Sequence, residues 1–346
     1  MRRIIYLILI VSLFTTPVMA MEFSAPAAPE SAEPYMPNTS GSFTKDVWYI
    51  IKKGIVEFFP CISETAGICV STLVITMLVS LLRGFVGLSA KTVELAGIIA
   101  ISTILLSPSN ALISIGIQTV EAMSEYGKLL LPVMTGALAA EGGTITSTSL
   151  YTGTVIFNSV LSTGITKLLI PMLYAYIALS VAKAAVDEQV LKDLQAFLKW
   201  LITWTLKISI YLFVGYMGVT GVISGTADAA AIKAAKLAIS GTVPVIGGII
   251  SDASETILVS AGIMKNAAGT YGLLAILATW IGPFLQIGVQ YLILKLTSAV
   301  GSVFGYKKAV SLIENFGVAM GFLVAMTGTM CLLILISIVC FMKGVS

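Results

Sequence analysis

The sequence contains no histidine. Histidine is the commonest general base at neutral pH, the commonest metal ligand and a usual side chain of proton relays. Its absence argues against ordinary hydrolytic chemistry, so we expect no catalytic residues, no cofactor and no metal. The nucleotide-binding P-loop, the zinc-protease HExxH pattern and the nucleophile elbow are also missing, so nothing indicates nucleotide hydrolysis or metalloprotease activity.

Charged residues are scarce as well. Only 11% of the 346 residues are charged and 57% are hydrophobic, whereas about a quarter of a typical soluble domain is charged. The mean hydropathy of +1.00 means more apolar surface than a soluble domain can bury. We therefore predict an all-α, polytopic helical membrane protein. The net charge of +3 is spread along the chain, so a nucleic-acid partner is not expected.

Cysteines are few, and none of them forms a CxxC pair. Three of them lie in apolar runs, where cysteine usually serves as a small packing residue. We expect neither a disulfide nor a metal centre from Cys61, Cys69, Cys331 and Cys340.

Residues 1–20 have the layout of a secretory signal peptide, with two arginines, an apolar stretch and small residues at its end. An uncleaved first transmembrane helix is the alternative. Residues 21–60 are predicted to form an extracytoplasmic lead, which begins as a disordered, proline-rich segment. Within it, residues 43–60 place apolar side chains on one helical face, which is typical of an interfacial helix or of an ordinary packed helix.

Six apolar runs are predicted to cross the membrane. Lysine and arginine gather in the connections after the first, third and fifth runs. With the N-terminus exported, this excess of positive charge places all three basic connections in the cytoplasm, provided that the intervening segments cross an even number of times. The connector 186–201 carries one apolar stripe and is expected to lie along the cytoplasmic surface. The six runs are residues 67–82, 93–106, 168–182, 200–222, 270–294 and 316–341.

A tandem repeat is predicted at an offset of 112 residues. Aligning LPVMTGALAAEGGTI (131–145) with VPVIGGIISDASETI (243–257) needs no gap, and the same offset pairs Pro171 with Pro283. Coincidence is the alternative in so apolar a chain. An even number of crossings per unit makes the repeats parallel, and an odd number makes them inverted. The predicted organisation is N-terminal transmembrane helices at 61–120, a first membrane repeat at 121–222 and a second at 223–346.

Each copy contains a break with proline and glycine, followed by acidic and hydroxyl side chains. Broken backbone is tolerated at membrane depth only where protein buries it or where it lines a wet cavity. We therefore predict broken or re-entrant helices beside a pore or binding site. Alternatively, the acids lie at the membrane interface and the glycines serve helix packing or a simple turn. The candidate pore residues are Pro132, Gly136, Glu141, Gly142, Gly143 and Thr144 in the first copy and Pro244, Gly247, Gly248, Ser251, Asp252 and Glu255 in the second.

Two segments, LPVMTGALAAEGGTIT (131–146) and AAIKAAKLAISGTVPVIGGIISDASETILVSAGIMKNAAGTYGLL (230–274), resemble the stage III sporulation protein AE family of endospore-forming bacteria. The resemblance implies a multi-pass mother-cell membrane subunit of a channel-like complex that joins the mother cell and the engulfed forespore. It implies, as partners, the other membrane proteins of the stage III A operon and the stage II protein Q, and a role in late forespore gene expression. It implies no catalytic residues.

Two hypotheses of other classes stay open. A self-contained secondary transporter would use Glu141, Asp252 and Glu255 as coupling or substrate groups inside the membrane. A purely structural scaffold would use its glycines only to pack helices. In every case the lipid bilayer is an expected contact, and a homo-oligomer is a further expectation.

Overall fold

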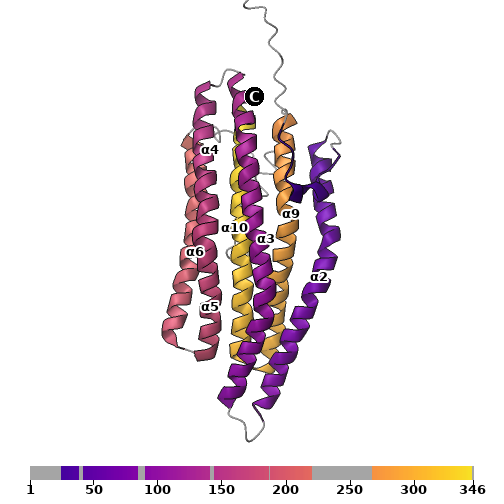
Figure 1. The fold of residues 1–346 in the computed structure, drawn as a ribbon, viewed down its shortest axis with the longest axis vertical. Helices are drawn as coiled ribbons and strands as arrows, with labels where there is room; N and C mark the ends of the chain where they lie inside the picture. Colours follow the sequence, from indigo (N-terminus) through magenta and orange to yellow (C-terminus); the bar gives the residue numbers. More distant parts are fainter. Residues whose placement is uncertain are drawn as a thin grey trace, which may run out of the picture.

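The computed structural model describes residues 25–38, 42–84, 90–140, 144–186, 188–219 and 267–344 (Figure 1). These residues form helices, and no strand occurs among them. The predicted signal peptide lies outside the described residues. So do all six candidates of the second copy, Pro244, Gly247, Gly248, Ser251, Asp252 and Glu255.

The described helices follow one another along the chain, and residues 220–266 between α6 and α9 lie outside the described residues. The π-helix η2 joins α4 directly to α5, so these three elements form one continuous crossing. In chain order the elements are η1 (Glu30–Tyr35), α2 (Phe43–Leu82), α3 (Ala90–Ala140), α4 (Thr144–Gly164), η2 (Ile165–Leu169), α5 (Ile170–Val186), α6 (Gln189–Val219), α9 (Ala267–Gly301), η3 (Ser302–Phe304) and α10 (Lys307–Gly344).

Six of the described helical segments are long and apolar enough to cross a membrane, judged by length and composition. Each of the six predicted runs overlaps a different one of them, which confirms the all-α polytopic fold. Successive segments alternate in direction, so that α2, α4–α5 and α9 run one way and α3, α6 and α10 the other (Figure 1). The connections α2–α3, α5–α6 and α9–α10 therefore share one end of the bundle. We call it the basic end, because the lysines and arginines of all three connections lie there.

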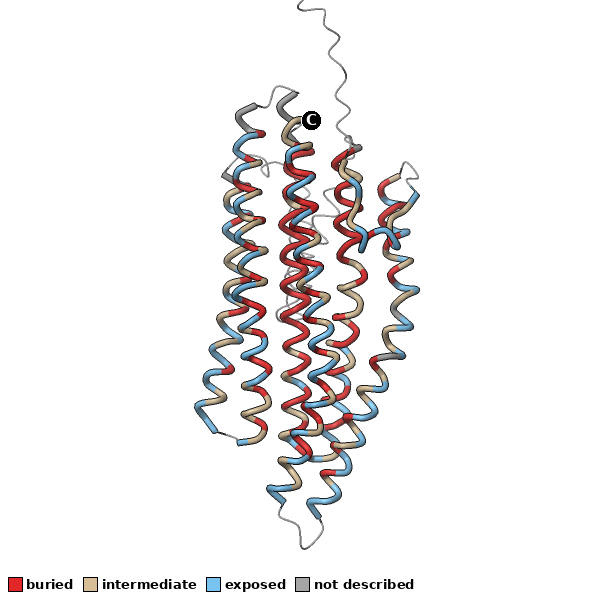
Figure 2. Tube along the Cα trace, in the orientation of Figure 1, coloured by how far each residue is buried: buried red, intermediate tan, exposed pale blue. Residues whose placement is uncertain are grey.

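Helix α10 lies in the middle of the bundle (Figure 2). Its most apolar stretch is 94% buried, compared with 22% for α2. A helix that is apolar all round is suited to this central place. Its few hydroxyl groups bond to the backbone of the same helix, as Thr329 does to the carbonyl of Ala325 at 2.7 Å and Ser337 to that of Leu333 at 2.7 Å. Burial therefore leaves these polar groups satisfied.

The helix break predicted at Pro132 and Gly136 is not present, because α3 continues through both residues to Ala140. A proline removes one backbone donor, and packing inside a bundle tolerates that loss. The neighbouring side chains of Leu130 and Met134 are fully buried and hold the helix in place on both sides of the proline. The helix also continues through Pro108, where the sequence predicted the end of a span.

The N-terminal lead is also more ordered than predicted. Residues 30–35 form η1, in which Ala32 and Tyr35 are buried, and α2 begins at Phe43 as the first part of a crossing helix. The predicted apolar face packs against protein: a Cβ placed on Gly54 would lie 2.9 Å from both Ile281 and Leu285 of α9. Part of the predicted face is nevertheless open, since Ile55 is 50% exposed, and the choice between the two alternatives for residues 43–60 stays a prediction.

Most of the predicted connector 186–201 belongs to the long helix α6. Gln189 begins α6, which runs antiparallel to α5 (Figure 1). Buried Gln195 holds the two helices together, because its amide donates to Ser180 Oγ at 2.6 Å and its carbonyl oxygen accepts from Lys183 Nζ at 2.9 Å. The segment is therefore the first part of one long helix, whereas its place at the cytoplasmic surface stays a prediction.

The two hairpins α4–α5/α6 and α9/α10 run in the same directions, and Lys183 and Lys295 lie toward the basic end of each (Figure 1). A repeat of these units would therefore be parallel rather than inverted. The hairpins differ in position, because α10 is central and α6 is peripheral. The repeat itself stays a prediction.

Candidate functional site

The first-copy candidates do not form a site among the described residues. Pro132 is exposed and Gly136 half-buried, both within the last part of α3. Thr144 is the first residue of α4. The residues between these helices, Glu141, Gly142 and Gly143, lie outside the described residues.

A polar stripe on α3 was missed by the sequence predictions. Its members are exposed, and their spacing of three or four residues places them on one face of the helix. At 1.5 Å per residue the stripe extends about 32 Å, close to the thickness of a bilayer hydrocarbon core. We call this set the α3 stripe: Ser107, Asn110, Ser114, Gln118, Glu121, Glu125 and Lys128.

The α3 stripe lies at the level of the most apolar part of α10. Gly116 of α3 packs against Leu323, and a Cβ placed on Gly127 would lie 3.5 Å from Ile334. The chain from Glu314 to Lys343 carries no charged residue between these two. The polar groups of α3 therefore lie level with a part of α10 that carries no charged residue.

The π-helix η2 presents Lys167 at the same level. Asn158 Nδ2 donates to the carbonyl of Ser124 at 3.1 Å, and Tyr174 donates to Asn110 Oδ1 at 2.6 Å. These two hydrogen bonds fix the antiparallel pairing of α3 with α4–α5. Lys167 lies between the two bonded positions of its own helix and is exposed, so it is level with the middle of the α3 stripe. Single π-helical turns within longer helices are frequent at functional sites.

The charged residues of the α3 stripe and Lys167 have no ion-pair partner among the described residues. The ion pairs found there lie at the basic end, Arg83 with Glu94, Lys308 with Glu94, and Lys295 with Glu314, each at 3.0 Å. A charge at the centre of a bilayer costs roughly 2.5 to 3.5 kcal/mol on insertion scales. The stripe and Lys167 therefore require water, polar headgroups or another protein beside them.

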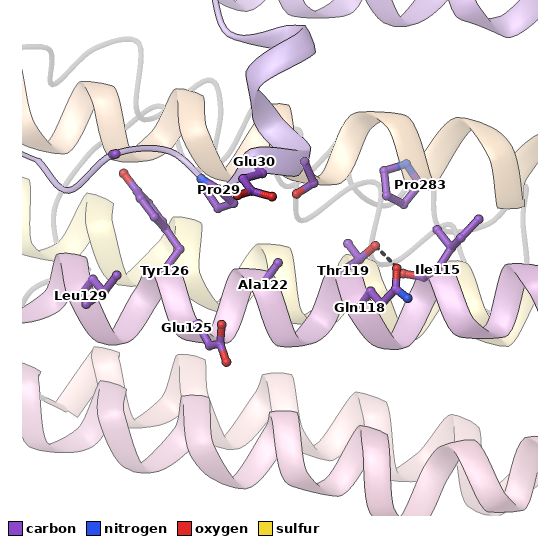
Figure 3. Close-up of a pocket in the computed structure, with 12 residues that line it drawn as sticks. Pro29, Glu30, Ile115, Gln118, Thr119, Ala122, Glu125, Tyr126, Leu129 and Pro283 are labelled. Atoms are coloured by element: carbon purple, nitrogen blue, oxygen red, sulfur yellow. Dashed lines mark hydrogen bonds between the residues drawn. The ribbon is translucent and has the colours of Figure 1, made fainter.

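A cavity of about 460 Å³ adjoins the α3 stripe where the N-terminal segment crosses α3 and α9 (Figure 3). Gln118 and Glu125 belong to both the stripe and the lining, and Glu30 adds a second carboxylate. The volume is within the usual range for small-molecule sites. The N-terminal segment is held there by two hydrogen bonds: Tyr126 donates to the carbonyl of Pro26 at 3.4 Å, and the Ala28 amide donates to Tyr271 Oη at 3.3 Å.

Tyr35 fixes the segment on the opposite side. Its hydroxyl donates to a carboxylate oxygen of Glu57 in α2, and burial, together with this hydrogen bond, raises the pKa of Tyr35 above its usual value. The ring lies so close to α9 that a Cβ on Gly282 would be 2.8 Å from the Tyr35 oxygen. The segment thus acts as a strap across α2, α3 and α9.

The basic end has a network of its own. Glu94 of α3 accepts from Arg83 and from Lys308, each at 3.0 Å. Tyr306 donates to the Glu94 carbonyl at 2.7 Å and lies beneath the Arg83 guanidinium at 5.5 Å. Burial raises the pKa of Tyr306 to about 12, and the nearby Glu94 carboxylate adds to the shift. This network joins the end of α2 to the starts of α3 and α10.

No group of three Cys, Asp or Glu side chains that could hold a metal ion occurs in the described part of the chain. The arrangement offers instead a polar surface level with the apolar stretch of α10 and an acidic cavity under the N-terminal segment.

Comparisons with known proteins point to one family. A family model for stage III sporulation protein AE matches residues 31–344. The stage III sporulation protein AE of Bacillus subtilis (strain 168) is 20% identical over 183 residues, which is 53% of this chain and 46% of the relative. The matched region therefore spans less than half the length of that relative. No solved structure matches the chain.

Proposed function

Because the chain belongs to the stage III sporulation protein AE family, we propose that it is a non-enzymatic membrane subunit of a channel-like complex linking mother cell and forespore. The observation that carries the proposal is the family match, which extends over residues 31–344. Six segments suited to crossing a membrane support it. So does the α3 stripe, since polar residues at membrane depth are typical of transport pathways and subunit contacts.

Membership of this complex implies an orientation of the chain in the membrane. The basic end faces the mother-cell cytoplasm, because positive charge is retained on that side of a membrane. The opposite end, where α4 begins at Thr144 and α9 at Ala267, faces the forespore. Proposed partners are the other membrane proteins of the stage III A operon on the mother-cell side and the stage II protein Q opposite them.

A secondary transporter is the second candidate, and the cavity beside α3 is the observation that favours it. Two carboxylates, Glu30 and Glu125, line a space of about 460 Å³, which suits a small cationic solute. In this alternative, Glu125→Gln abolishes function while the protein remains in the membrane. In the channel-subunit proposal, the same substitution has little effect, because no solute is bound at that carboxylate.

Gene deletion in the spore-forming host tests the proposal. We expect a late forespore reporter to fall to background, an early forespore reporter to be unchanged, and expression of the intact chain in the mother cell to restore the late one. Expression of the chain in the forespore alone should not restore it. A normal late signal in the deletion strain would overturn the proposed role.

A further inference from the structure

We draw no further inference here: the strongest candidate, the polar face formed by the α3 stripe and Lys167 of η2, carries none, because nothing in the part of the chain that the structure describes shows what covers it.

Discussion

The contact between α2 and α3 near the basic end depends on a glycine, and Gly97→Ala should weaken it. A Cβ at Gly97 would overlap Cγ2 of Val79 and would lie 3.3 Å from Cγ1 and 3.4 Å from Cβ of the same residue. Val79 is only 5% exposed, and its β-branched side chain has little rotamer freedom in a helix. The two helices must therefore separate slightly to admit the methyl group.

The magnitude follows from two opposing effects. Overpacking of a well-filled contact costs about 1 to 3 kcal/mol, and replacing a helical glycine by alanine returns roughly 0.5 to 1 kcal/mol. We expect a net loss of about 1 kcal/mol in the free energy of unfolding for Gly97→Ala. Gly288→Ala is the matched control, because a Cβ there meets nothing within 4 Å, and it should be neutral or stabilising. Reversible unfolding of the purified protein in mixed micelles of increasing denaturing detergent measures both.

A double-mutant cycle identifies the cause. Val79→Ala removes the two methyl groups that collide with the new side chain, so the combined loss should be smaller than the sum of the two single losses by about 1 kcal/mol. If Gly97→Ala is as stable as Gly288→Ala, or if the two losses simply add, the close approach of α2 and α3 is incorrect.

Three further outcomes are expected. Gln195→Leu removes both hydrogen bonds from α6 to α5 and should lower the free energy of unfolding by about 1 kcal/mol in the same assay. This value follows from about 0.6 kcal/mol for an average interhelical hydrogen bond in a membrane. An unchanged free energy of unfolding would show that the two bonds contribute nothing. The pKa of Tyr306 is raised to about 12 in the folded chain, above the usual tyrosine value of about 10. The contribution of Tyr306 to folding stability should therefore be complete below about pH 10. It should decline as the pH rises toward 12, because the unfolded chain loses the hydroxyl proton of Tyr306 first. The decline should be smaller in Tyr306→Phe. Tyr35→Phe removes the hydrogen bond to Glu57 and should speed proteolysis of the N-terminal strap from outside the membrane; an unchanged rate would show that other contacts hold it.

The sequence predicted the crossing segments well because they are governed by composition. Each of the six apolar runs overlaps its own helix, and the basic connections share one end of the bundle. The prediction of a helix break at Pro132 was wrong. A proline was expected to end the helix, whereas burial of Leu130 and Met134 on either side keeps α3 continuous. Tertiary packing outweighs the local preference of one residue.

The candidate site was less predictable, because it depends on contacts between distant residues. Lys167 comes level with the middle of the α3 stripe only through the antiparallel pairing of α3 with α4–α5, which the Asn158 and Tyr174 hydrogen bonds fix. The exposed spacing of the α3 stripe was present in the sequence as a periodic signal. It was missed because the predicted span ended before Ser107, so the polar residues beyond it were assigned to separate segments.

The proposed function requires that the bundle lies across the membrane with its basic end in the cytoplasm. Single cysteines at Lys91, Glu188 and Lys307, one in each basic connection, and at Thr144, at the opposite end, test this in a chain whose native cysteines are replaced. With a membrane-impermeant maleimide on intact, non-sporulating cells that express the chain, we predict labelling of Thr144→Cys alone, and labelling of the other three only after the membrane is opened. Labelling of any basic connection from outside would contradict the orientation and the depth assigned to the α3 stripe.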